Sequence, residues 1–241
     1  ASPNYFEITE HIENKELAAE VVNRLSYEYP YKKSLRVKSR YSVSEINQVA
    51  GNHYKKTLAI PNFAQGKKNI TPAEKGNIYH EIMEHIDFKE AGENGVSYIK
   101  KALETFIKED IFLREEIDSI DISKIADFFQ ESLGKRAVAA QSRNELFKEV
   151  PFNLVKTFEG EEVIVQGIID CFFKEGDGWI LLDYKTNYID KSKNRAEELE
   201  RIKTAYVEQL KIYKEALEVS KNEKVTESYL YLFDVGEQIK L

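Results

Sequence analysis

Apolar positions recur three and four residues apart in several stretches of this chain, which is the spacing of a helix that buries one face. Such stretches cover residues 5–27, 71–88, 96–109, 122–142 and 194–219. The second has the strongest start signal, because Thr71 can cap it, Pro72 suits its first turn and Glu74 can reach back to the cap. Gly134 is expected to break the fourth stretch. The pattern therefore predicts a largely helical first part of the main domain.

A strand pattern replaces the helical one near residue 146, where short runs rich in β-branched and aromatic residues begin. The predicted strands are 146–157, 162–173, 179–185 and 228–233. The turn sequence Glu-Gly-Asp-Gly at 175–178 makes a hairpin of the second and third strands. The helix before the last strand is a crossover, so this strand should run parallel to a neighbour. The predicted fold class is α+β, with a mixed central sheet flanked by helices.

The N-terminal segment has a looser pattern. Residues 27–40 include the run YKKSLRVKSR, which carries five basic side chains and no acidic one, and they are predicted to be a linker. Residues 42–45 form a capping box for a short helix, and 51–70 are expected to be loop. We therefore expect an extension and linker over residues 1–40 and the main domain over 41–241.

The composition narrows the class of protein. With 42% hydrophobic residues the chain can form a packed core, and its single cysteine, Cys171, excludes a disulfide framework or a four-cysteine iron–sulfur cluster within it. The longest apolar runs are far shorter than the roughly 20 residues that a bilayer span needs. A cytoplasmic protein with no membrane partner is expected.

The charge balance argues against binding nucleic acid by bulk attraction. The net charge is −7 and the sequence pI is about 5.4. Basic side chains are nevertheless concentrated at 31–40 and 185–195. A metal-dependent nuclease gathers carboxylates in its site and needs positive charge only along the path of the strand, so this class stays open.

The candidate chemistry lies in the predicted hairpin. Asp170 and Asp183 each follow an apolar run, where an unpaired carboxylate would be costly to bury. Asp183 and Lys185 are two residues apart and share one face of their strand. A cross-strand salt bridge is one explanation. Two aspartates facing one lysine favour a hard-metal site suited to phosphodiester hydrolysis.

Other candidates are ambiguous when each is taken alone. His80 lies on a predicted helix, where a single histidine is most often structural. Gln209 and Tyr213 are four residues apart and therefore share one helical face. Glu149 lies on the first predicted strand, where a surface glutamate is the ordinary expectation.

Taken together, these residues fall into five motifs in one order. The motifs are Gly76-Asn-Ile-Tyr-His80, Glu149-Val-Pro-Phe152, Gly167-Ile-Ile-Asp170, Asp183-Tyr-Lys-Thr186 and Gln209-Leu-Lys-Ile-Tyr213. Their order and spacing resemble the RecB-type nucleases of the PD-(D/E)XK superfamily, most closely the nuclease domains of the AddA group. The resemblance covers roughly residues 40–241 and implies a restriction-endonuclease-like core.

The resemblance also implies roles for individual residues. Mg²⁺ or Mn²⁺ would be held by His80, Asp170, Asp183 and the main-chain carbonyl of Tyr184. Lys185 would be the catalytic lysine, and Gln209 and Tyr213 would face the site and the DNA. Glu149 would be a supporting acidic residue.

The resemblance further implies a context in DNA repair by recombination. The chain has no G-x-x-x-x-G-K-[ST] motif, so no ATP site is expected in it. It would be the nuclease domain of a helicase–nuclease, an exonuclease on single-stranded DNA. Its partners would be an AddB-like protein and a helicase motor on the same full-length chain. The alternatives are a stand-alone exonuclease and an inactive nucleic-acid-binding scaffold on the same fold.

Overall fold

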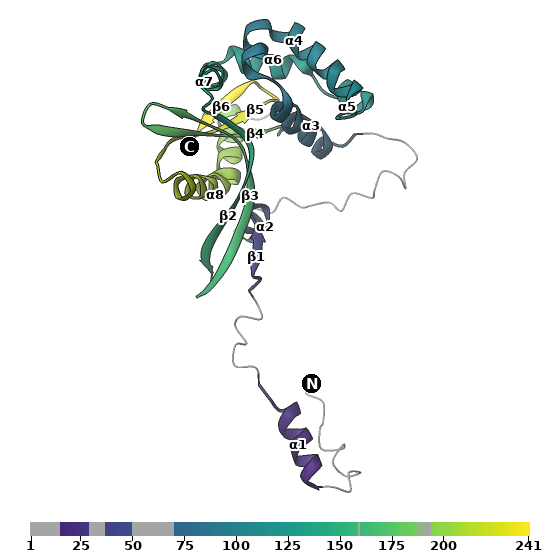
Figure 1. Ribbon diagram of the computed structural model, residues 1–241, viewed down its shortest axis with the longest axis vertical. Helices are drawn as coiled ribbons and strands as arrows, with labels where there is room; N and C mark the ends of the chain where they lie inside the picture. The colour runs from purple at the N-terminus through teal and green to yellow at the C-terminus, as the bar shows by residue number, and fades with distance from the viewer. Residues whose placement is uncertain (1–14, 29–36, 50–69, 159, 188, 190–193) are drawn as a thin grey trace. The chain divides into compact units, whose positions relative to one another are not determined.

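The computed structural model describes residues 15–28, 37–49, 70–158, 160–187, 189 and 194–241 (Figure 1). The described chain divides into two compact units. One contains the described residues up to Ser39 together with 157–163, and the other contains 40–156 with 164–241. The boundary between extension and main domain at residue 40 stays a prediction.

The first unit contains helix α1, Lys15–Leu25. Part of its apolar stripe is open to solvent, since Leu17 and Leu25 are both more than half exposed. The first ten residues of the predicted helix, 5–14, lie outside the described residues. So do residues 29–36 of the predicted linker and 51–69 of the loop predicted over 51–70.

The second unit is built on a mixed sheet, as the sequence predicted, although the ends of two of its strands lie within residues 157–163 of the first unit. The described strands are β1 Arg40–Ser42, β2 Leu146–Phe158, β3 Glu161–Glu175, β4 Gly178–Lys185, β5 Val225–Leu232 and β6 Glu237–Lys240. Their order is β1-β3-β4-β5-β6, and β2 also pairs with β3. Strand β4 is antiparallel to β3 and parallel to β5. The parallel pairing follows from the crossover helix α8, Arg195–Lys221.

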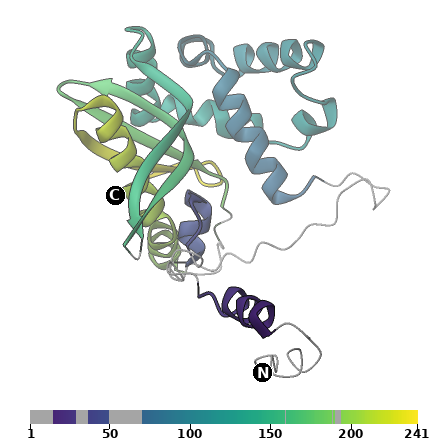
Figure 2. The ribbon, with the colours of Figure 1, turned by 60° about the horizontal axis from the view of Figure 1, so that its bottom comes forward.

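Helices cover both faces of this sheet. Those between the linker and β2 are α2 Val43–Val49, α3 Pro72–His85, α4 Phe88–Lys108, α5 Arg114–Asp118, α6 Ile122–Gln130 and α7 Ser132–Gln141. Figures 1 and 2 show α3 to α7 gathered on one side of the sheet. Helix α8 packs against β4 and β5 and also contacts α2. The central strands are therefore buried on both faces, and β4 is buried from Gly178 to Tyr184.

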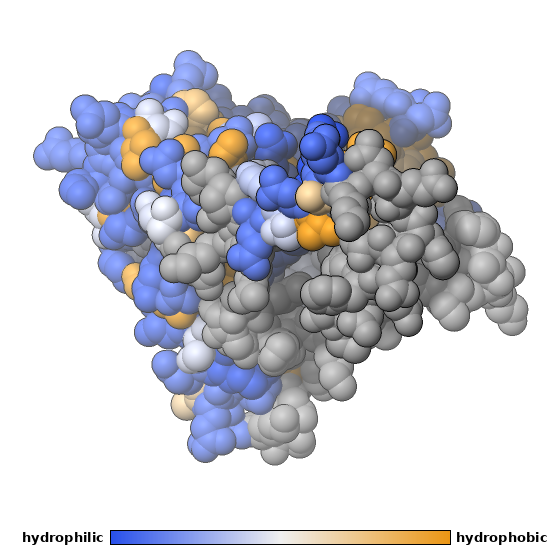
Figure 3. Space-filling model, turned by 90° about the horizontal axis from the view of Figure 1, so that it is seen from below, coloured by the Kyte–Doolittle hydropathy of each residue, from blue (hydrophilic) through white to orange (hydrophobic). Residues whose placement is uncertain are grey.

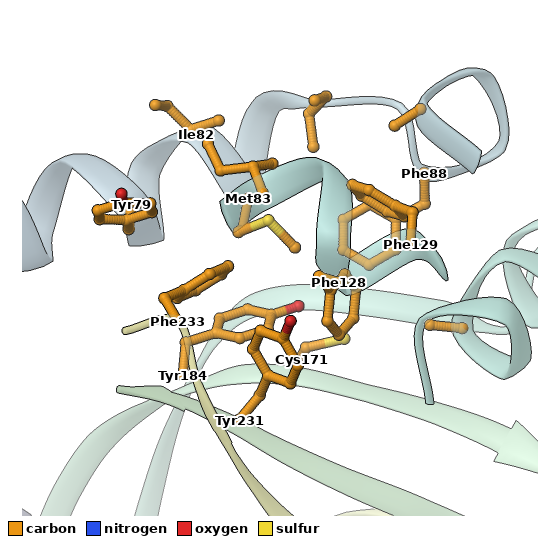
Figure 4. Close-up of a cluster of buried hydrophobic side chains, with 14 of the residues drawn as sticks. Tyr79, Ile82, Met83, Phe88, Phe128, Phe129, Cys171, Tyr184, Tyr231 and Phe233 are labelled. Carbon is orange, nitrogen blue, oxygen red and sulfur yellow. The ribbon is translucent and has the colours of Figure 1, made fainter. Parts of the chain in front are cut away.

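The main core lies between the helices α3 to α7 and the sheet. Phe128 of α6 stands edge-on to the rings of Tyr184 and Tyr231, with centroids 5.9 and 4.9 Å away (Figure 4). Ile82 and Met83 of α3 close the same cluster. Tyr184 therefore points into this core, which turns its neighbours Asp183 and Lys185 toward the opposite face.

Several elements differ from the sequence-based expectation. The fourth predicted helix breaks at Glu131, between α6 and α7, and not at Gly134. Gly134 has another role there, because a Cβ at this position would lie 2.0 Å from the carbonyl oxygen of Phe128. Helix α4 is kinked at Gly95, whose φ of +54° is not helical. The part after the kink matches the helix predicted from residue 96, and the part before it, which Asp87 caps, was not predicted. The short elements β1, α5 and β6 carried no recognisable signal.

The described surface is mainly polar on the face shown in Figure 3, with scattered apolar side chains. None of the helices in the described part of the chain is long and apolar enough to span a bilayer.

Candidate active site

The two buried aspartates meet where β3 and β4 run side by side. Cys171 pairs with Leu182 in the antiparallel register, so the next positions along the two strands are Asp170 and Asp183. Asp170 is 7% exposed and Asp183 is fully buried. The main-chain N–H of Tyr184 donates a hydrogen bond of 2.7 Å to Oδ2 of Asp170. The structure thus brings both carboxylates to one place, as the hairpin predicted.

Lys185 forms an ion pair with Oδ2 of Asp183, on the strand face that the two residues share. Burial raises the pKa of Asp183 to about 6, although Lys185 acts in the opposite direction. Burial alone would lower the pKa of Lys185, but Asp183 and Asp170 together raise it above its ordinary value. Lys185 therefore carries its proton at neutral pH, next to a carboxylate.

His80 reaches the aspartates from α3. The capping box of this helix is complete, since Thr71 N–H donates to Glu74 Oε2 at 2.7 Å and Glu74 N–H donates to Thr71 Oγ1 at 3.2 Å. His80 Nδ1 lies 3.5 Å from Asp170 Oδ2 and 3.7 Å from Glu149 Oε1. These separations are longer than a good hydrogen bond, so the contacts are electrostatic.

The carboxylates around His80 control its protonation. Burial disfavours the imidazolium, but Asp170 and Glu149 outweigh it and raise the pKa of His80 to about 10. Burial also works against ionisation of Asp170, yet His80 and Lys185 lower the pKa of that carboxyl below its ordinary value. The imidazolium thus offsets part of the negative charge of the two carboxylates next to it.

Glu149 has a strained backbone conformation, and its side chain faces His80. Its backbone φ is +48°, in the left-handed region that a glutamate seldom adopts, and Pro151 follows two residues later on β2. Its Oε1 is buried and has no hydrogen-bond partner within the described chain. Burial raises the pKa of Glu149. A strained backbone and an unsatisfied buried oxygen are both features of functional sites.

These observations fit a divalent cation. One donor atom from each of His80, Glu149 and Asp170 lies within 4.8 Å of the other two. Carboxylate oxygens and one imidazole nitrogen suit Mg²⁺ or Mn²⁺, and the unsatisfied oxygen of Glu149 is a ready ligand. The geometry thus groups Glu149, expected only as a supporting residue, with the donors. The ligand roles predicted for Asp183 and the Tyr184 carbonyl stay predictions.

Helix α8 supplies the remaining polar contacts. Gln209 Nε2 donates to Asp183 Oδ1 at 3.0 Å and to the Tyr213 hydroxyl at 2.9 Å. The Tyr213 ring stands edge-on to Phe152 of β2, with centroids 5.6 Å apart. Gln209 thus orients Asp183, and both predicted α8 residues lie at the site.

One residue of the site was not recognised from the sequence. Lys185 Nζ lies 4.7 Å from the ring centroid of Tyr206, whose hydroxyl donates to Asn187 Oδ1 at 3.0 Å. The helical spacing of apolar residues places Tyr206 in the buried stripe of α8 and gives it no role in the chemistry. Its position three residues before Gln209, on the same helical face, was the available signal.

The fold and the site together define the class of protein. Residues 40–240 match the family model of the PD-(D/E)XK nuclease superfamily. The chain belongs to this superfamily, which confirms both the predicted resemblance and the predicted fold class.

Curated relatives are named as the A subunits of ATP-dependent helicase/nucleases. The protein from Syntrophomonas wolfei is 33% identical over 240 residues, covering 92% of this chain and 19% of the relative. The proteins from Alkaliphilus metalliredigens and Clostridium botulinum strain Alaska E43 are 33% and 35% identical, covering 95% and 94% of this chain and 20% of each relative. The chain thus spans about a fifth of the length of these relatives.

Proposed function

We propose that this chain is a divalent-metal-dependent deoxyribonuclease that hydrolyses phosphodiester bonds in single-stranded DNA as an exonuclease. The observation that carries the proposal is the convergence of buried Asp170 and Asp183 with Lys185, beside His80 and Glu149. A purely structural salt bridge would need neither the unsatisfied Glu149 oxygen nor its positive φ.

His80, Glu149 and Asp170 would hold the metal ion, with Asp183 and the Tyr184 carbonyl as the further ligands implied by the family resemblance. Mg²⁺ or Mn²⁺ bound there would neutralise charge on the phosphate and make bound water more acidic.

Lys185 has a separate task in the reaction. Hydrolysis joins a water oxygen to phosphorus, breaks the bond between phosphorus and the departing oxygen, and moves one proton to that oxygen. Because its pKa is raised, Lys185 stays charged and donates hydrogen bonds to the attacking water or to a nonbridging phosphate oxygen. Asp183 and the Tyr206 ring hold its ammonium in place.

The relatives support a wider setting for the chain. We infer that it is the nuclease domain of a cytoplasmic helicase–nuclease that processes DNA ends for repair by recombination, together with an AddB-like partner protein. The helicase motor, on the same full-length chain, would deliver the strand. Such delivery suits a domain whose net charge of −7 gives little bulk attraction for DNA.

The test is cleavage of end-labelled single-stranded DNA with Mg²⁺ and without ATP. Wild type should cut, excess chelator should stop it, and a duplex of the same sequence should be cut more slowly. Lys185→Ala should lose activity by at least about 100-fold, the scale of removing one oxyanion donor. Exposed Lys89→Ala is the matched control and should cut like wild type.

The result separates the proposal from its alternatives. Unchanged cleavage by Lys185→Ala would contradict the role of this lysine. Binding of DNA without cleavage, by wild type in either Mg²⁺ or Mn²⁺, would favour the inactive scaffold. Rapid processive digestion of duplex ends by this chain alone would favour a stand-alone exonuclease.

A further inference from the structure

A cavity of about 220 Å³ lies next to the end of β4, the strand that carries Asp183 and Lys185. Thr186, which follows Lys185 in the chain, lines it, together with Lys75 from the first turns of α3 and Lys124 from α6. Asp121 and Asp234 are the acidic residues in its wall. The two lysines and two aspartates of the lining have a net formal charge of zero. The charge that a ligand would meet therefore depends on which of these side chains are already paired with one another.

Three of the four charged side chains are already engaged. Lys124 Nζ lies 2.8 Å from Asp234 Oδ1, and Asp234 Oδ2 also accepts the Ile189 N–H at 3.2 Å. Asp121 caps α6, since its Oδ1 accepts from the N–H and hydroxyl of Ser123 at 3.0 and 2.7 Å.

Lys75 and Thr186 are different. Within the described part of the chain, neither the Lys75 ammonium nor the Thr186 hydroxyl has a hydrogen bond or an ion pair. The cavity therefore presents one uncompensated cation and one free hydroxyl. An anionic oxygen is the ligand that both would bind.

Gly76 explains why these two groups share one cavity. A Cβ at Gly76 would lie 3.0 Å from Thr186 Oγ1, tighter than ordinary van der Waals contact. The absent side chain lets α3 approach the end of β4 closely. His80 of the proposed metal site lies on the same face of α3, four residues after Gly76 and therefore about 6 Å from it along the helix axis. At ~3.4 Å per nucleotide of a stacked strand, this is one or two nucleotide steps.

We propose that this cavity binds a phosphate of the DNA strand one or two nucleotides from the phosphate that is cut, with Lys75 and Thr186 as its donors. The inference rests on the proposed function, because it takes the scissile phosphate to lie at Lys185. The cavity positions the strand and takes no part in bond breaking, so its loss changes affinity and not the chemical step.

The experiment measures the salt dependence of DNA binding. Binding of fluorescently labelled single-stranded DNA is titrated at several NaCl concentrations for wild type, Lys75→Ala, Thr186→Val and exposed Lys89→Ala. Loss of one phosphate contact should flatten the plot of log affinity against log salt by ~0.7, the value per phosphate for single strands. Lys75→Ala should show this change and Lys89→Ala should not.

Kinetics provide the second readout. Lys75→Ala should raise KM about tenfold with kcat within about twofold of wild type, and Lys75→Arg should restore most of the affinity because it keeps the charge. Thr186→Val, which keeps the shape of the side chain, should raise KM by a smaller factor at an unchanged salt slope. A salt slope for Lys75→Ala equal to that of wild type would overturn the proposal.

The outcomes keep the two proposals apart. If wild type binds DNA without cutting it and Lys75→Ala flattens the salt slope, the phosphate site stands and the nuclease proposal fails. If wild type cuts DNA and the slope is unchanged, the nuclease proposal stands and the phosphate site fails. Absence of any DNA binding by wild type would overturn both.

Discussion

The main-chain N–H of Tyr184 donates a 2.7 Å hydrogen bond to Oδ2 of Asp170. Tyr184 lies between Asp183 and Lys185, and its own ring is locked into the core against Phe128. The bond therefore ties the position of the β3 carboxylate to the strand that carries the other carboxylate and the lysine. The core thus fixes the geometry of the site, while the charged groups supply its chemistry.

Gln209 holds Asp183 from α8, so its removal should weaken catalysis without removing a proposed ligand. For Gln209→Ala we expect single-turnover cleavage to fall by about 10- to 100-fold, the range found for groups that orient metal ligands. Gln130→Ala, an exposed change at the end of α6, is the control. Wild-type rates in Gln209→Ala would show that the bond to Asp183 does not matter for cleavage.

Tyr206 should act through its ring. Tyr206→Leu removes the aromatic face next to Lys185 and should lower kcat by about 2- to 30-fold, the equivalent of ~0.5–2 kcal/mol, while KM stays near wild type. Tyr206→Phe keeps the ring and removes the hydroxyl that bonds Asn187. Its kcat should stay within about threefold of wild type. Equal losses in both variants would place the effect in the hydroxyl instead.

Substitutions of Glu149 should weaken metal binding, and their effect on stability should depend on how well the new residue tolerates a positive φ. Both Glu149→Asn and Glu149→Ala remove the unsatisfied carboxylate and should weaken Mn²⁺ binding at least tenfold. Asparagine tolerates positive φ better than alanine, so Glu149→Asn should be the more stable variant by about 1 kcal/mol in urea unfolding. Two variants of equal stability would argue that the backbone is not strained here.

Glu227 should make the protein sensitive to acid. Lys240 and Arg136 contact its carboxylate and lower its pKa to about 2. Because the pKa in the folded state is lower than in the unfolded state, the contribution to stability is complete above about pH 5. It is lost as the pH falls toward 2.

The measurement is the urea midpoint of wild type and Glu227→Gln between pH 7 and pH 2.5. The gap between the two proteins should be widest at pH 7 and should narrow steadily on acidification. Glu93→Gln, on the exposed face of α4, should show no comparable gap at any pH. A gap that is independent of pH would mean that the carboxylate charge contributes nothing.

The sequence predicted the hairpin and the crossover because their signals are local. Alternating apolar residues fix which face Asp183 and Lys185 share, and a helix between two strands makes them parallel. The same reasoning could not find the three residues of β1, which are held by pairing with β3 and carry little propensity of their own.

The parts of the site that were missed depend on tertiary structure. The positive φ of Glu149 is not encoded in its neighbours, so its aim toward His80 appears only in the folded chain. Tyr206 was assigned to the core because a tyrosine at the spacing of a helix's apolar stripe is most often a core residue. Its contact with Lys185 requires α8 to lie against β4.

The most direct test of the account is a calorimetric titration of Mn²⁺ into wild type, Asp170→Asn and Lys185→Ala. The account predicts that wild type binds the ion and that Asp170→Asn loses binding. It also predicts that Lys185→Ala binds at least as tightly as wild type, because a competing positive charge has been removed. Equal Mn²⁺ affinity in wild type and Asp170→Asn would contradict the metal site and, with it, the proposed chemistry.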